Sequence, residues 1–191
     1  MQPPLILGIV GEKSSGKAVV GRYIARNYGY PFIVFSENVL NVILELLDLN
    51  WRDHRVQGRL AEALRNTFGL DVIARAVLKQ VRQQKRAKVV IVDGVREFGE
   101  LRLLKRLKNF RLLYVTAPME YRWKRAYGRN ERIDDRVSLS EFRRIESLPH
   151  EREIPKIGRQ ADYRIDNVGS TRELYKKIDV VMRQIRLVQK K

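Results

Sequence analysis

The stretch GEKSSGK, residues 11–17, has the glycine and lysine spacing of a phosphate-binding (Walker A) loop, G-x-x-x-x-G-K. Gly11 would permit a sharp exit from the preceding apolar run, and Gly16 would let backbone N–H groups approach phosphate oxygens without a Cβ. Lys17 would add a charge for the β- and γ-phosphates at a helix start, where the dipole favours anions. We predict that the nucleotide is held by Gly11, Glu12, Lys13, Ser14, Ser15, Gly16, Lys17 and Ala18.

Position 18 departs from the usual pattern, in which a Ser or Thr hydroxyl after the lysine binds Mg²⁺. Ala18 cannot coordinate a metal. A small residue here resembles the adenylate-kinase-like branch of the P-loop kinases. The resemblance implies that Mg²⁺ is held through phosphates, water and nearby carboxylates, which suits an ion that dehydrates reluctantly.

A second group follows the apolar run at 88–92, where KVVIVDGVRE places Asp93 and Gly94 at the end of an expected strand. Ligands collect at the carboxyl ends of strands in open α/β sheets. Asp93 could orient Mg²⁺ through water, and Arg96 could grip a phosphate of the acceptor with its planar donors. The pair resembles the D-G-x-x-R region of nucleoside monophosphate kinases, with the arginine one residue sooner. A plain turn followed by a surface arginine is the alternative.

Arginines recur every three or four residues in the segment 122–137. Phosphoryl transfer needs mobile cations that close over the developing charge and exclude water, and this segment resembles the lid of such kinases. Arg125 and Arg129 are the predicted catalytic cations, and on a helix they would share a face with Arg122. A solvated face is the alternative, especially for Arg132 and Arg136. Nearby Asp134 and Asp135 could form lid ion pairs.

The stretch ADYRIDNVGS, residues 161–170, resembles the A-D-x-x-I-x-N-x-G-S stretch that passes near the nucleotide base in many P-loop kinases. The resemblance implies that Asn167, Val168 and Gly169 border adenine. An ordinary strand-to-helix loop, capped by Ser170, is the alternative.

Together, residues 5–28, 88–136 and 161–187 resemble the group that includes adenylate kinases, dephospho-CoA kinases and deoxynucleoside monophosphate kinases. The group implies a three-layer α/β/α fold with a five-stranded parallel sheet in the order 2-3-1-4-5. It also implies ATP and Mg²⁺ as cofactors, and transfer of the γ-phosphoryl group to an acceptor.

The expected acceptor-binding segment, residues 36–87, matches that group less well. FSENVLN puts Asn38 and Asn41 where the related kinases have an acid and a base, although Glu37 could stand in as a base. Further on, the residues resemble the R-x-x-Q and L-R-x-x-x-G-x-D pattern of deoxynucleoside-monophosphate-kinase-like sequences, with Asp71 as its last member. The predicted acceptor-binding residues are Ser36, Arg55, Gln57, Arg65 and Arg96, with a plain helix surface as the alternative.

Short apolar runs alternate with longer helical patterns along the chain, as in βαβ units that form a parallel sheet. We expect strands at 5–10, 31–35, 88–92, 110–115 and 161–165. Helices are expected at 17–28, 37–48, 59–67, 70–85, 97–107, 118–127, 138–147 and 170–188. Without a linker or repeat in between, residues 1–191 should form one domain.

The net charge of +17 and pI near 10.4 predict attraction to polyanions. The runs KQVRQQKRAK and LRLLKRLKNFR fit solvated helix faces, yet they keep nucleic acid open as a partner. The chain has no cysteine, and only His54 and His150 as histidines, so a metal would need carboxylates. Neither a signal peptide nor a membrane-spanning run is evident, so we expect a cytoplasmic protein without a membrane partner.

Three functions remain open from the sequence. The leading one is an ATP-dependent kinase that phosphorylates a (deoxy)nucleoside monophosphate or similar small phosphorylated acceptor, with Lys17, Asp93, Arg96, Arg125 and Arg129 as catalytic residues. A dephospho-CoA kinase is the enzymatic alternative. The third is a basic ATP-binding switch protein that associates with RNA, although the aromatic residues, at 8%, form no RNA-binding motif.

Overall fold

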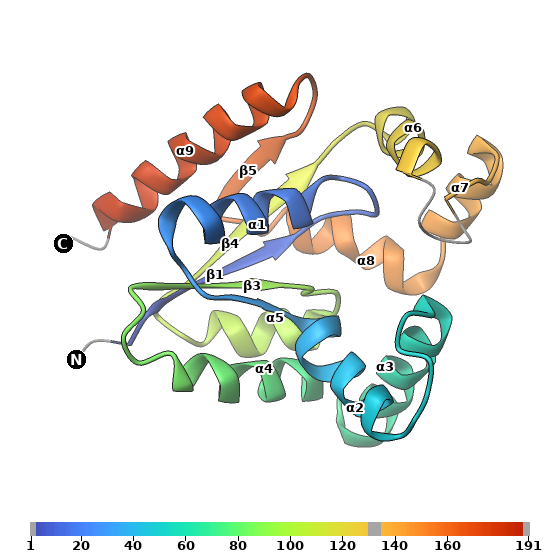
Figure 1. Cartoon of the computed structure of the whole chain (residues 1–191), viewed down its shortest axis with the longest axis horizontal. Coiled ribbons are helices and arrows are strands. Elements are labelled where there is room, and N and C mark those ends of the chain that lie inside the picture. Colours follow the sequence, from blue (N-terminus) through green and yellow to red (C-terminus); the bar gives the residue numbers. More distant parts are fainter. Residues whose placement is uncertain (1–2, 130–134, 189–191) are drawn as a thin grey trace.

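Five parallel strands form the central sheet in the order β2-β3-β1-β4-β5, which confirms the expected topology (Figure 1). The computed structural model describes residues 3–129 and 135–188. Continuous apolar runs make up β1 and β3, because helices cover both faces of the sheet. The strands are β1 (Leu5–Val10), β2 (Phe32–Val34), β3 (Val89–Asp93), β4 (Phe110–Thr116) and β5 (Tyr163–Asp166).

Helices pack on the two faces of the sheet in separate layers, as expected for a three-layer α/β/α fold. One layer holds α1 (Lys17–Tyr28) and α9 (Thr171–Val188). The other holds α4 (Val72–Gln83), α5 (Phe98–Lys105) and α8 (Pro149–Gly158). In Figure 1, strand β3 is drawn between α1 and the helices α4 and α5 of the other layer. Both layers bury aliphatic side chains against the strands. This packing holds the carboxyl ends of the strands in place relative to one another.

The first part of the expected acceptor segment, residues 36–68, folds into three helical pieces rather than the two helices at 37–48 and 59–67, and the third expected helix, 70–85, is α4. A π-helical turn, η1 (Ser36–Leu40), leads into α2 (Asn41–Leu46), and α3 (His54–Phe68) follows. Helix α3 starts earlier than its apolar periodicity indicated, because Asp53 caps it by accepting a 2.8 Å hydrogen bond from the Arg55 backbone N–H.

The segment after the fourth strand contains α6 (Met119–Arg129), α7 (Leu139–Glu146) and α8. Helix α8 was not expected from the sequence, because its interior Pro155 argues against a helix. Its start carries the usual signal, a proline in the first turn, and Ile154 and Ile157 bury one face. Among the described residues, no helix is both long and apolar enough to cross a bilayer.

Strand register places the predicted site residues at one edge of the sheet. Ile9 of β1 pairs with Asp93 of β3, and Val10 pairs with Tyr114 of β4. The loop after β1 therefore starts beside the Asp93 carboxylate and the end of β4, as expected for a ligand site in an open α/β sheet.

Candidate active site

The loop between β1 and α1 has a backbone that only glycine allows at two positions. A Cβ on Gly11 would lie 2.2 Å from the Val115 carbonyl oxygen, and Gly16 has a φ of +97°. Ser14, at φ 59°, also lies in the left-handed region. The loop therefore folds as a compact turn, closed by the 3.1 Å hydrogen bond from the Ser15 N–H to the Glu12 carbonyl.

The loop and the start of α1 offer polar groups to an anion. Within the described residues, the buried Ser14 and Ser15 hydroxyls have no hydrogen-bond partner. Helix α1 begins at Lys17 and lacks a side-chain cap in the described structure, so its first N–H groups face the loop. Such a helix start, with a lysine beside it, fits the phosphates of a nucleotide.

Glu12 is anchored beneath the loop and faces β4. Its carboxylate accepts hydrogen bonds from the Tyr114 hydroxyl and, at 3.1 Å, from the Thr116 hydroxyl. Burial, together with the bond to Glu12, raises the pKa of Tyr114 to about 12, so the phenol stays a donor. The Glu12 side chain thus supports the loop, while its backbone remains part of the predicted phosphate cradle.

Asp93 ends β3 as a buried carboxylate, 5% exposed. Its Oδ1 has no hydrogen-bond partner among the residues described. Burial raises the pKa of Asp93, and the positive charges of Lys17 and Arg96 oppose that rise. Asp93 therefore lies close enough to Lys17 for their charges to interact. A cation beside its unpartnered oxygen would stabilise the charged form of the carboxyl.

These observations fit ATP with Mg²⁺ as the expected cofactors. Asp93 has the chemistry of an oxygen ligand for Mg²⁺, and the loop has that of a phosphate cradle. In the described part of the chain, no three His, Cys, Asp or Glu residues form a metal cluster. A magnesium ion would therefore need phosphate and water oxygens for most of its ligands.

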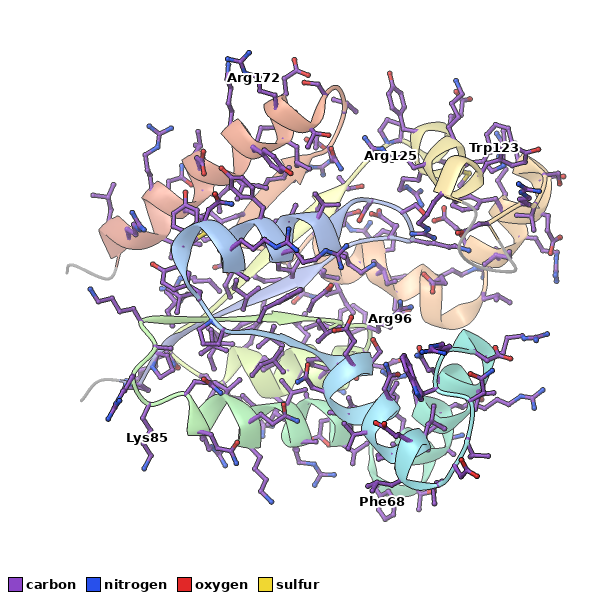
Figure 2. All side chains as sticks on the ribbon, in the orientation of Figure 1. Phe68, Lys85, Arg96, Trp123, Arg125 and Arg172 are labelled. Carbon is purple, nitrogen blue, oxygen red and sulfur yellow. The ribbon has the colours of Figure 1, made fainter. Side chains whose placement is uncertain are left out.

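Arg96 lies close to Asp93 but pairs with another element. One of its Nη atoms lies 2.8 Å from a carboxylate oxygen of Glu151 on α8, and its side chain is 38% exposed. Figure 2 shows it near the middle of the molecule, beside the open end of the sheet. An acceptor phosphate could replace Glu151 as the partner of this accessible guanidinium.

Two of the arginines in the predicted lid make contacts close to the loop between β1 and α1. Arg122 is buried, donates at 2.8 Å to the Ala117 carbonyl, pairs with Glu146 of α7 and reaches the Lys13 carbonyl at 3.4 Å. Arg125, labelled at α6 in Figure 2, donates at 2.9 Å to the Asn167 carbonyl. Its other terminal nitrogen is buried without a partner in the described structure, and burial lowers its pKa.

Arg129 forms a two-bond ion pair with Asp135, at 3.0 and 2.8 Å. Asp135 is completely buried and also lies 3.8 Å from the ammonium nitrogen of Lys13. This carboxylate therefore links the lid to the phosphate loop, a stronger arrangement than an exposed pair. The predicted lid members Arg132 and Asp134 lie outside the described residues, and Arg136 is exposed.

The predicted base-binding loop contacts the phosphate loop directly. The Asn167 side chain is buried and donates a 2.7 Å hydrogen bond to the Ser15 carbonyl. Val168 is 37% exposed, and Gly169 adopts a φ of +93° before α9 begins. Asn167 thus joins three of the predicted parts: the phosphate loop, the base loop and, through Arg125, the lid.

The side chains of the predicted acceptor residues have different partners, although Glu100 accepts hydrogen bonds both from the Arg65 side chain and from the Arg96 backbone N–H. Gln57 is buried and donates to Asn41 Oδ1 at 2.7 Å and to the Trp51 carbonyl at 2.6 Å. Arg65 pairs at 2.8 Å with the fully buried Glu100, whereas Arg55 is exposed and pairs with neighbouring Asp53. Ser36 is half-buried at the start of η1. These pairings favour structural roles for Gln57 and Arg65, and their acceptor roles stay predictions.

Three carboxylates that form ion pairs with these predicted site arginines were not predicted from the sequence. They are Glu100, which pairs with Arg65, Glu146, which pairs with Arg122, and Glu151, which pairs with Arg96. Only Glu100 carried a local signal, because Glu97 and Glu100 form a capping box at the start of α5. The other two contact their arginines across large sequence separations, which no local pattern reveals.

Solved structures with similar folds include shikimate kinases and a dephospho-CoA kinase. A shikimate kinase from Acinetobacter baumannii is 21% identical, with a TM-score of 0.56 over 95% of this chain and 94% of that one. A dephospho-CoA kinase from Campylobacter jejuni is 16% identical, with a TM-score of 0.55 over 96% and 98%. At such identities the likeness defines the fold, so this is a protein of the P-loop kinase fold.

Curated relatives identify the family more narrowly, whereas no family model matches the chain. A UPF0200 protein from Methanoregula boonei is 30% identical over 88% of this chain and 90% of its own length. The chain therefore belongs to the UPF0200 family. A UPF0200/UPF0201 protein from Archaeoglobus fulgidus is 29% identical over 93% of the chain, which spans only 54% of that relative.

Proposed function

We propose that the protein is an ATP-dependent phosphotransferase that moves the γ-phosphoryl group to a (deoxy)nucleoside monophosphate or similar small phosphorylated acceptor. One observation carries the proposal: in the described structure, the hydroxyl oxygens of Ser14 and Ser15 in the loop before α1, and an oxygen of Asp93 at the end of the neighbouring strand β3, are buried without a hydrogen-bond partner. Buried polar atoms normally have partners, so these oxygens call for a polar ligand. The fold of the neighbouring kinases supports the same proposal.

In this proposal, the loop backbone and Lys17 bind the β- and γ-phosphates, and Asn167 holds the loop against the base site. Magnesium, when bound, would neutralise phosphate charge, and Asp93 would hold it through water. Arg125 would turn its unpartnered nitrogen toward the nucleotide, and Arg129 would stabilise charge on the transferred group. Catalysis would rest on positioning and electrostatics, as in other phosphoryl transfers.

Arg96 is the best candidate for binding the acceptor phosphate, because it is accessible and lies close to Asp93. A phosphate acceptor needs no strong general base. The amide of Asn38, which accepts a 2.8 Å hydrogen bond from the Val34 N–H, is consistent with that choice.

A dephospho-CoA kinase is the second candidate, favoured by the position of Glu37. A hydroxyl acceptor needs a base, and the exposed Glu37 lies near enough to Asp93 to affect its pKa. Under this alternative, Glu37→Gln should abolish transfer to dephospho-CoA. If the acceptor group is instead a phosphate, the rate of transfer should be little changed by Glu37→Gln.

The test is an acceptor panel with purified protein, ATP and Mg²⁺, in which ADP release is measured. The panel contains the common nucleoside and deoxynucleoside monophosphates and dephospho-CoA. We expect one of the monophosphates to raise ADP release well above the background, and Asp93→Asn to remove the increase. If no acceptor raises ADP release, the phosphotransferase proposal is wrong.

A further inference from the structure

Positive charge is concentrated on the layer that contains α4 and α5. Residues 72–111 hold twelve Lys and Arg residues but only three carboxylates, so about a fifth of the chain supplies more than half of its net charge of +17. Two of the three carboxylates, Asp93 and Glu100, are buried. The third, Glu97, is half-buried at the start of α5. Helices α4 and α5 therefore expose almost no acidic side chain of their own in the described structure, and Asp71 lies at the N-cap of α4.

Nine exposed cations, here called the basic face, lie on α4, on α5 and directly after each helix. Within the described structure, Arg75 is the one member with a carboxylate partner, Asp71, at 3.4 Å. Figure 2 shows Lys85 projecting away from the body of the molecule at one end of this face. The members are Arg75, Lys79, Arg82, Lys85, Arg86, Arg102, Lys105, Arg106 and Lys108.

Two hollows of about 410 Å³ each lie along α5, and Arg102 and Arg106 line both. Phe98 contributes apolar surface to one hollow, and Leu70 to the other. Phe68, two residues before Leu70, is 60% exposed, and Figure 2 shows it on the lower side of the molecule, at the opposite end from Lys85. Planar guanidinium groups and an exposed aromatic ring can stack on unpaired bases.

We propose that the basic face binds single-stranded nucleic acid, with the cations on its phosphates and bases stacked on Phe68 and in the hollows. Helix α4 has 12 residues and is about 18 Å long, and the basic face continues along α5, so a single strand would place about five phosphates along it, roughly one for every two of the nine cations. This proposal does not depend on the proposed phosphoryl transfer.

Two other partners fit this face less well. Membrane-surface helices insert a row of exposed apolar side chains, and α4 and α5 carry no such row in the described structure; Phe68 and Leu70 lie before α4 rather than along it. A second copy of the chain would bring two strongly positive faces together, which like-charge repulsion opposes.

The test measures the binding of a labelled 12-nucleotide RNA by fluorescence anisotropy over a series of salt concentrations. Roughly five phosphate contacts predict a slope of log K against log salt of about −3 to −4 for a single strand. A triple variant removes three charges from the basic face, and a matched variant removes three from α9 on the opposite layer. The two variants are Lys79→Gln/Arg82→Gln/Arg102→Gln and Arg172→Gln/Lys176→Gln/Arg183→Gln.

We expect the basic-face variant to bind RNA at least tenfold more weakly and to reduce the salt slope by about 2, while the α9 variant binds like the parent. Phe68→Leu changes no charge and should weaken RNA binding about tenfold, with heparin binding unchanged. Equal losses in the two triple variants would overturn the proposal, as would tighter binding of duplex. Binding of anionic vesicles without any RNA binding at low salt would also overturn it.

Discussion

Arg65→Met should destabilise the protein by about 3 to 5 kcal/mol, because the change leaves a buried carboxylate without its counter-charge. Arg65 is 12% exposed and lies 2.8 Å from Glu100, whose side chain is fully buried. Glu100 also accepts hydrogen bonds from the backbone N–H groups of Arg96, at 2.8 Å, and Glu97, at 3.2 Å. For a chain of this size the thermal midpoint should fall by roughly 6 to 20 °C.

The loss should depend on pH in a defined direction. Burial raises the pKa of Glu100, and the charge of Arg65 opposes that rise. A carboxyl with a raised folded-state pKa contributes stability below its unfolded pKa and loses it as pH rises through the folded pKa. Removing Arg65 raises the folded pKa further. The variant should therefore be close to the parent near about pH 4 and fall behind toward neutral pH.

Thermal and urea unfolding, followed by circular dichroism at several pH values, measure this effect. Arg59→Met, an exposed change on the same helix, is the control and should stay within about 0.5 kcal/mol of the parent. The double variant Arg65→Met/Glu100→Gln should regain most of the lost stability. If Arg65→Met unfolds like the parent but raises the KM of the acceptor, Arg65 binds the acceptor and our structural reading is wrong.

Three further changes test the nucleotide site. Asp93→Asn should lower turnover about 100-fold or more, and an active variant would contradict the metal role. The nucleotide-free variant should melt at the same or a higher temperature than the parent at neutral pH, because burial raises the pKa of this carboxyl and disfavours its charge. Asn167→Ala removes the 2.7 Å hydrogen bond to the Ser15 carbonyl and should raise the KM for ATP about tenfold. An unchanged KM in steady-state kinetics would contradict this prediction. Gly16→Ala places a Cβ 2.3 Å from Asn167 Nδ2 at a φ of +97°, so fluorescent-nucleotide titration should show ATP affinity reduced about 100-fold. Gly58→Ala is its control, since a Cβ there meets no described atom within 4 Å, and affinity should not change.

The sheet, and the position of the predicted nucleotide-binding residues at one edge of it, were predictable because their signals are local. The glycines of the phosphate loop, the strand before Asp93 and the stretch around Asn167 each lie within a few residues of one another in sequence. Parallel topology then brings the strand ends to one edge, so local patterns were enough to place these residues together.

The acceptor half and the lid contacts could not be predicted in the same way. Arg65 and Glu100 are 35 positions apart, and Arg96 and Glu151 are 55 apart, so their pairing depends on tertiary packing. Helix α8 was not predicted because Pro155 interrupts its helical pattern. This helix carries Glu151, the carboxylate that pairs with Arg96. Ion pairs of this kind decide which arginines remain accessible to a substrate, and sequence spacing alone does not report them.

The central claim is that the loop after β1 and Lys17 hold the triphosphate of a nucleotide. Titration of Mg²⁺ and ATP by isothermal calorimetry, with the parent, Lys17→Ala and the exposed control Lys176→Ala, tests it most directly. We predict that Lys17→Ala weakens ATP binding about 100-fold, whereas Lys176→Ala binds like the parent. Unchanged ATP affinity in Lys17→Ala, or no ATP binding by the parent, would contradict the account.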